Sequence, residues 1–475
     1  MRSLPVCTRR DFLRTASCGF GSVALAGLLS EHLAAATNPL APHPPHFKPR
    51  AKHVIFLFMQ GGPSQIDLFE HKPRLVKEHG KPLPFRRPSD EAEDGVERSK
   101  LLAPVARVNR RGQCGTWWSD LLPHLAKQVD RICLLNAMVA DNPAHPPASM
   151  QIQTGYTTGP HPAMGAWISY GLGTENRNLP GFVTLSPLLS GDGGGPHLFG
   201  SAYLPAVHQG MPVGLDGGRP VVRYLNRADL PDSRQREQLA LLESMNRDLQ
   251  ARTGVDDKLE SMIRSFELAF RMQAAVPELF DLSRESAATR KLYGIGEGAA
   301  DSFGKRCLLA RRLVESGVRF VQLTYGAWDH HQNIRSALPA ACATVDRPIA
   351  GLLADLHGRG LLEETLVIWT GEFGRSPYDQ DISLGKDGEE TFGRGHNPYG
   401  FTAWLAGGGI KGGLTHGATD EYGYRAVEGK VHVHDLHATI LHLLGIDHEK
   451  LTYRHAGRDF RLTDVFGHVV KEILA

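Results

Sequence analysis

The sequence has little charge imbalance, few cysteines and no apolar run long enough to cross a membrane. Its 475 residues include 53 Lys and Arg against 51 Asp and Glu, a net charge of +2. A binding surface for nucleic acid is therefore not expected. None of the six cysteines forms a C-x-x-C pair, which excludes zinc-finger motifs. The apolar stretch at 19–29 is shorter than the about 20 residues of a membrane span, so we expect no stable span.

Histidine and glycine, by contrast, are plentiful. The chain has 23 His and 52 Gly, and histidine is the side chain that both ligates metals and titrates near neutral pH. Apolar residues make up 41% and charged residues 22%, the composition of a globular chain rather than a disordered one. This combination is typical of a metal-dependent enzyme with loop-built sites, although composition alone does not establish one.

The N-terminus has the pattern of an export signal. Arg9 and Arg10 precede Phe12 and Leu13, and a short apolar core and three alanines at 34–36 follow. A charged segment, an apolar core and small residues before a cleavage site define a signal peptide, and the arginine pair resembles the twin-arginine signal. We predict that residues 1–36 are removed on export to the periplasm or the extracellular space.

The remaining chain reads as a Pro-rich linker at 37–50 and one domain at 51–475, with a helical segment at 231–292. Strands are expected at 53–59, 131–138, 318–324, 366–370 and 401–406, and helices at 119–129, 302–316, 340–357 and 435–444. We expect little helix at 141–220, which is rich in Gly and Pro. Alternating strands and helices predict an α/β fold with a mostly parallel central sheet and helices on both faces.

Polar residues cluster directly after the expected strands, where α/β sheets carry their sites. These residues are Gln60, Asp329, His330, His331, Glu372, Arg375, Arg394 and His396. Carboxylate and imidazole groups together suit a transition metal, whereas carboxylates alone suit calcium or magnesium.

Asp329 and Glu372 also have a purely structural interpretation. Asp329 is a suitable cap for a helix that begins near Gln332. Glu372 follows a buried strand and needs a partner there, and Arg375, three residues on, would make a structural ion pair. The sequence leaves both alternatives open.

A second dense segment contains His145 and Ser149. Prolines flank His145 and restrict its backbone. Ser149 is expected to start a helical turn, where it would either cap the helix or meet an anion at the positive helix end. His145 is a candidate general acid or base, or a transient nucleophile.

Six motifs together resemble a known family. They are MQGGPSQIDLFEHKP at 59–73, GAWISYGLGTENRNLPGFV at 165–183, WDHHQN at 328–333, TGEFGRSP at 370–377, GRGHNPYGFTAWLAGGG at 393–409 and HDLHATILHLLG at 434–445. The set is similar to the exported domain-of-unknown-function family fifteen-oh-one, whose members are often labelled sulfatase-like. The resemblance covers about residues 50–475. It implies an alkaline-phosphatase-like α/β fold, grouped with the phosphatases and sulfatases, with a metal site at the strand ends.

Several positions depart from the pattern of that superfamily. His145 stands where sulfatases carry the modified cysteine nucleophile, and Ser149 stands where they carry an arginine. Gln60 replaces a ligating aspartate, and Phe373 replaces a ligating histidine. The resemblance therefore points to the other metal site of phosphatases.

That site would be formed by Asp329, His396 and one of the neighbours His330 and His331. Glu372 and Gln60 would lie nearby, and the bound ion would be Zn, Mn or Ca. Arg375 and Arg394 would offset the negative charge of a substrate.

Two functions follow from this interpretation. The first is an exported metal-dependent hydrolase-like protein acting on a small or polymeric phosphate or sulfate ester. The second is a non-catalytic protein whose degraded site binds an anionic glycan or a protein partner. The substitutions at Gln60, His145 and Phe373 favour the second function. The sequence does not indicate an oligomeric state.

Overall fold

A computed structural model describes residues 39–86, 99–185, 195–216, 219–222, 231–253, 257–379 and 391–475. The expected signal peptide at 1–36 lies outside these ranges, as do residues 37 and 38 of the expected linker.

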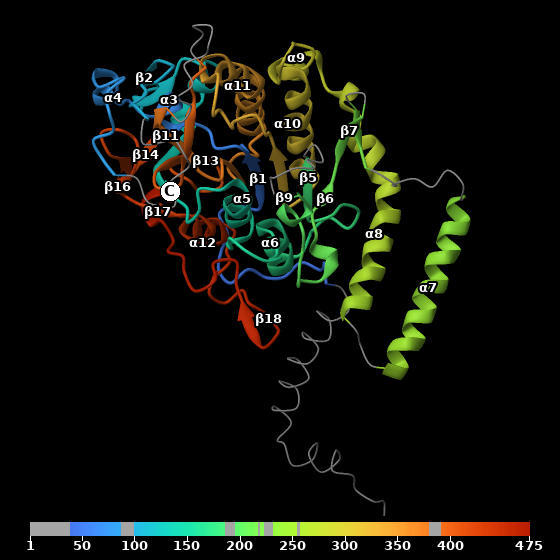
Figure 1. Cartoon of the computed structure of the whole chain (residues 1–475). Coiled ribbons are helices and arrows are strands. Elements are labelled where there is room, and N and C mark those ends of the chain that lie inside the picture. Colours follow the sequence, from blue (N-terminus) through green and yellow to red (C-terminus); the bar gives the residue numbers. More distant parts are fainter. Residues whose placement is uncertain are drawn as a thin grey trace, which may run out of the picture.

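A nine-stranded sheet forms the centre of the molecule, in the order β14-β4-β13-β10-β1-β9-β5-β6, with β17 also paired to β4 (Figure 1). Its strands are β1 (His53–Phe58), β4 (Ile132–Val139), β5 (Phe182–Leu185), β6 (Met211–Pro212), β9 (Phe320–Thr324), β10 (Thr365–Thr370), β13 (Phe401–Ala406), β14 (Leu414–His416) and β17 (Val431–His432). Only β13 runs against its neighbours β10 and β4; every other pairing is parallel. The predicted α/β fold with a mostly parallel sheet is confirmed.

The sheet is covered on both faces, as the unbroken apolar run of β1 predicts. Successive side chains of a strand point to opposite faces. Phe56 of β1 belongs to one apolar core, which also contains Ile152 and Ile440. Leu57, the next residue, belongs to the other core, together with Leu308. Helices α5, α6 and α12 therefore cover one face, and α10 and α11 cover the other (Figure 1).

The long helices match the periodicity of the sequence. They are α10 (Ala300–Glu315), α11 (Ile334–Gly358) and α12 (Val433–Leu443), and the helical segment forms α7 (Asp232–Thr253), α8 (Asp257–Phe280) and α9 (Ala287–Leu292). Figure 1 shows α7 alongside α8, on the side of α8 away from the central sheet.

Two expectations about helices were wrong. The segment at 141–220 contains α5 (His145–Thr154) and α6 (Met164–Leu172). We expected a helical turn to start at Ser149, whereas α5 begins at His145, because its prolines occupy the first turn, where proline is tolerated. The expected helix at 119–129 is instead the end of a strand followed by two short turns of 3₁₀ helix.

Short elements connect the main ones. They are β2 (Val108–Arg111), β3 (Thr116–Ser119), β7 (Gly214–Asp216), β8 (Arg219–Val221), β11 (Gly374–Asp379), β12 (Arg394–Asn397), β15 (Ala418–Thr419), β16 (Ala426–Glu428), β18 (Tyr453–His455), β19 (Arg458–Phe460), α3 (Gln65–Leu68), α4 (Pro73–Lys77), η3 (Leu125–Lys127), η4 (Val129–Arg131), η5 (Gly195–Leu198), η6 (Ala206–His208), η7 (Leu282–Arg284) and η8 (Lys471–Ile473).

Residues 39–50, which the sequence analysis assigned to a linker, lie against the domain. The Phe47 amide donates to the Gly445 carbonyl at 3.2 Å, and the Arg50 amide donates to the Leu443 carbonyl at 2.8 Å. Leu40 is buried. Among the described residues, no helix is both long enough and apolar enough to span a membrane.

Candidate metal centre

The carboxyl ends of the parallel strands bring the site together. Asp329 and His331 follow β9, and Glu372 follows β10. His145 is the first residue of α5, which follows β4, and His396 lies on β12. Because β4, β9 and β10 run in the same direction, their following residues meet at one edge of the sheet.

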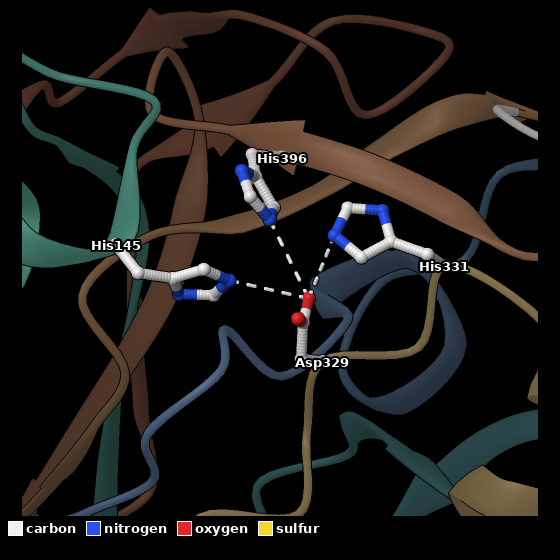
Figure 2. A group of neighbouring side chains, drawn as sticks. All are labelled: His145, Asp329, His331 and His396. Atoms are coloured by element: carbon white, nitrogen blue, oxygen red, sulfur yellow. Dashed lines mark hydrogen bonds and ion pairs between the residues drawn. The ribbon is translucent and has the colours of Figure 1, made fainter. Parts of the chain in front are cut away.

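Four of the predicted residues form one compact group (Figure 2). His145, Asp329, His331 and His396 each offer one ligand atom, and these atoms lie within 4.8 Å of one another. Asp329 Oδ1 is 2.9 Å from His331 Nε2, 3.3 Å from His145 Nε2 and 3.4 Å from His396 Nε2. The three imidazoles come from separate segments of the chain, and their Nε2 atoms all point toward one carboxylate.

The electrostatics of the group keep Asp329 ionised. Burial alone would raise the pKa of Asp329, but hydrogen bonds from the three histidines and the charge of Arg375 lower it strongly. Burial lowers the pKa of His396 to about 4, despite its contact with Asp329. For His145, burial opposes the charged form, yet its contacts with Asp329 and Glu372 raise its pKa to about 9. A negative carboxylate therefore faces a neutral His396 and a protonated His145.

Arg375 holds Asp329 in place rather than facing a substrate. Its guanidinium is buried and donates to Asp329 Oδ1 and to the carbonyl of Gly61. It also donates to the carbonyls of Gly62 at 2.9 Å and Arg394 at 3.0 Å. Because these N–H groups of Arg375 donate to protein atoms, the expectation that Arg375 offsets the negative charge of a substrate was wrong. Its ion pair is with Asp329, whereas the close contacts of Glu372 are with His145 and the Gly61 amide.

Glu372 lies behind the group instead of within it. Its side chain is 0% exposed, and its Oε1 lies 2.7 Å from His145 Nδ1. Both carboxylate oxygens accept from the Gly61 amide, at 2.9 and 3.1 Å. Glu372 thus contacts a histidine of the group from the far side and is not one of the four ligand residues.

Phe373 forms one wall of the group. Its ring stacks on His396 with centroids 4.4 Å apart and lies 4.9 Å from the ring of His145. The phenyl ring therefore packs beside the imidazoles and does not keep the four ligand atoms apart. It restricts the orientation of two of the three histidines.

Arg394 has a structural role, contrary to our expectation. Its Nε and Nη2 atoms donate to the two carboxylate oxygens of Asp67, at 2.8 and 3.1 Å. Its remaining N–H groups donate to the carbonyls of Leu102, Ser376 and Ala103. With all five donors engaged in this buried environment, Arg394 has none to offer a substrate.

Three further predicted residues lie outside the group. His330 is buried and is not one of the four grouped residues, so the choice left open between the two neighbours falls on His331. Ser149 lies fully buried inside α5, not at its start. The Oε1 atom of Gln60 and the Oγ atom of Ser149 are buried without a hydrogen-bond partner among the described residues.

The four residues fit a divalent transition metal. Zinc with bonds of about 2.0–2.1 Å to nitrogen and oxygen places tetrahedral ligands about 3.3 Å apart, close to the three N···O distances in the group. His145 Nε2 is buried, and its polar neighbour at the centre of the group is Asp329 Oδ1, 3.3 Å away. Once a metal displaces the proton from this nitrogen, its lone pair would face the three other ligand residues, which is the arrangement that a metal site requires.

Gly61 is a site residue that we did not single out. Its φ of +111° and its position against Asp329 require glycine, because a Cβ there would lie 2.6 Å from the Asp329 backbone nitrogen. This close approach lets the Gly61 amide reach Glu372 and its carbonyl reach Arg375. The consecutive glycines after β1 were the only signal of this role in the sequence.

Comparison with known proteins identifies the family. A family model described as "Protein of unknown function (DUF1501)" matches residues 51–474, which confirms the predicted membership. No curated protein matches the chain.

Similar solved structures include a sulfatase, an alkaline phosphatase and a lipoteichoic acid synthase. The PsFucS1 sulfatase from Pseudoalteromonas sp. is 15% identical over 84% of this chain and 69% of that chain, with a TM-score of 0.35. Alkaline phosphatase from the Antarctic bacterium TAB5 is 12% identical over 77% of this chain and 94% of that chain, with a TM-score of 0.32. The lipoteichoic acid synthase LtaP from Listeria monocytogenes is 9% identical over 90% of this chain and 80% of that chain, with a TM-score of 0.33.

Proposed function

The chain belongs to the DUF1501 family, whose description assigns no reaction, and we propose from its own site that it is a metal-dependent hydrolase-like protein acting on phosphate or sulfate esters. The observation that supports this proposal is the group formed by His145, Asp329, His331 and His396, whose ligand atoms lie within 4.8 Å of one another.

The four side chains would bind one divalent ion, with zinc or manganese preferred over calcium because three of the ligands are nitrogens. Such an ion supplies Lewis acidity, drawing electron density from an ester oxygen and lowering the pKa of water. Asp329 contributes the only carboxylate of the group, and Arg375 keeps that carboxylate oriented. His145 serves here as a ligand, since its two nitrogens are directed at Asp329 and Glu372.

The charge of the site favours an anionic substrate. Three neutral imidazoles and one carboxylate would leave a divalent ion with net positive charge. Arg375 and Arg394 donate their hydrogen bonds to protein atoms and do not face the substrate. The positive charge of the bound ion would therefore attract the anionic substrate in their place. We further propose that the protein acts in the periplasm or outside the cell. This location rests on the twin-arginine pattern at Arg9 and Arg10.

Metal content and hydrolysis test the proposal. Purified protein, stripped with a chelator and re-equilibrated with zinc and manganese in turn, is expected to bind about one ion per chain by mass spectrometry. The loaded protein is then assayed on aryl phosphates, phosphodiesters and aryl sulfates. Binding of less than about a tenth of an ion per chain would contradict the metal site. Stoichiometric metal with no hydrolysis of any ester would favour the non-catalytic binding protein instead.

A further inference from the structure

Glu372 is buried behind His145, one of the four residues of the metal group, and its carboxylate contacts that ring. We infer that Glu372 is a positioning residue that fixes the His145 ring, so that Nδ1 carries a proton and Nε2 presents its lone pair to the metal. This inference rests on the proposed metal site, and it assigns Glu372 a positioning role, whereas the sequence indicated only that Glu372 would lie near the metal.

Glu372 contacts the His145 ring on the side that faces away from Asp329. The Oε1 atom of Glu372 lies 2.7 Å from His145 Nδ1, while Nε2 of the same ring lies 3.3 Å from Asp329 on the opposite side. The ring thus spans the distance between two carboxylates. Only Asp329 belongs to the ligand group, because Glu372 is fully buried behind the imidazole.

Glu372 is itself held in position. The Gly61 amide donates to both of its oxygens, and the buried carboxylate has no Lys or Arg ion-pair partner among the described residues. A buried carboxylate without a cation is costly unless it accepts strong hydrogen bonds. The hydrogen bond from His145 Nδ1 therefore offsets the cost of burying the Glu372 carboxylate, and the same bond fixes the orientation of the His145 ring.

The chemical consequence concerns the tautomer of His145. A neutral imidazole has one N–H, and a carboxylate can only accept. With Glu372 beside Nδ1, the proton stays on Nδ1, and Nε2 is the nitrogen that loses its proton and binds the metal. Metal-ligating histidines commonly have such an outer carboxylate, and removing it typically weakens metal binding by about 10- to 100-fold.

The first arm of the test is cobalt binding, followed by the visible absorbance of the ion in chelator-stripped protein. Glu372→Gln is expected to weaken Co²⁺ affinity by about 10- to 100-fold. The matched control is Asp346→Asn, which alters another buried carboxylate. Asp346 accepts from the amides of His124 and Leu125 and is not part of the metal group. Its Co²⁺ affinity should stay within about threefold of wild type.

The second arm is nitrogen-15 NMR of histidine-labelled protein, with His145 assigned by its absence from the spectrum of His145→Gln. The Nδ1-bound proton of His145 is expected in both the metal-free and the zinc-loaded protein, and its signal should change in Glu372→Gln. A merely structural Glu372 would alter thermal stability but not this signal. An Nδ1 without a proton, or Glu372→Gln binding Co²⁺ as tightly as Asp346→Asn, would overturn the inference. If wild-type protein binds no Co²⁺, the proposed function fails, and the metal-free spectrum still decides the Glu372 contact.

Discussion

Arg394 and Asp67 are joined by two parallel hydrogen bonds, and neither side chain is exposed to solvent. Asp67 lies in α3, directly after the loop that follows β1, whereas Arg394 begins β12. The pair therefore attaches the strand that carries His396 to the loop that carries Gly61.

Removal of one partner from this pair should destabilise the protein strongly. Arg394→Gln leaves Asp67 buried without its cation, and we expect a loss of about 3–5 kcal/mol in the free energy of unfolding, measured by urea denaturation. The double variant Asp67→Leu with Arg394→Met should lose less than Arg394→Gln alone, because no uncompensated charge remains. A loss below about 1 kcal/mol in Arg394→Gln would contradict this structural role.

The neighbours His330 and His331 should differ sharply in metal binding. His331→Ala removes a nitrogen that lies 2.9 Å from Asp329 and is expected to lower Co²⁺ affinity by at least about 100-fold, more than the loss of an outer partner. His330→Ala, its matched control, should leave that affinity within about threefold. Equal losses in the two variants, measured by titration of chelator-stripped protein, would argue against the assignment of His331.

Substitution of Phe373 should lower Co²⁺ affinity less than His331→Ala does. Phe373→Leu keeps an apolar side chain but removes the ring that stacks on His396 at 4.4 Å. Aromatic pairs contribute about 0.5–1.5 kcal/mol, which corresponds to a loss of about two- to tenfold in Co²⁺ affinity. An unchanged or tighter affinity in this variant would show that the ring does not orient His396.

Stability should fall in mild acid because the fold buries neutral histidines. Burial lowers the pKa of both His208 and His437 to about 3, whereas an unfolded histidine titrates near 6.5. The folded pKa is the lower one, so this contribution to stability is complete above pH 6.5 and is lost as the pH falls. At pH 5 each residue should reduce the free energy of unfolding by about 2 kcal/mol.

The variant His208→Gln isolates one of these contributions. Glutamine can still bond to Ser169, which lies 3.0 Å from His208 Nδ1. We expect the loss of stability between pH 7.5 and pH 5 to be about 2 kcal/mol smaller in this variant than in wild type. The same pH dependence in both proteins would show that His208 is not buried in its neutral form.

The sequence predicted most of the sheet and the centre of the site because these depend on local patterns. The apolar runs that became β1 and β10 identify buried strands without reference to the rest of the fold. Asp329 and His331 follow from the rule that parallel strands bring their carboxyl ends to one edge. His396 lies on β12, just before the antiparallel strand β13, whose first residue is at the same edge.

Local sequence patterns could not predict the contacts between segments that are far apart in the chain. Nothing in the local sequence distinguishes Arg394, which pairs with a residue 327 positions away, from an arginine that faces a substrate. The orientation of Glu372 depends on the positive φ of Gly61, 311 positions earlier. Ser149 reads as a helix start until the helix is known to begin at His145.

The position of β1 also determines when the sheet can form during synthesis. β1 is among the first elements in the chain, yet its two neighbours are β9 and β10, and His53 is in register with Thr365. A nascent chain that ends before β9 therefore leaves both edges of this apolar strand unpaired, and one that ends before β10 leaves one edge unpaired. Folding has to wait for contacts of high sequence separation, which slows it and exposes a strand prone to aggregation. We expect C-terminal truncations within or before β10 to be insoluble, and full-length chains to benefit from holdase chaperones until synthesis is complete.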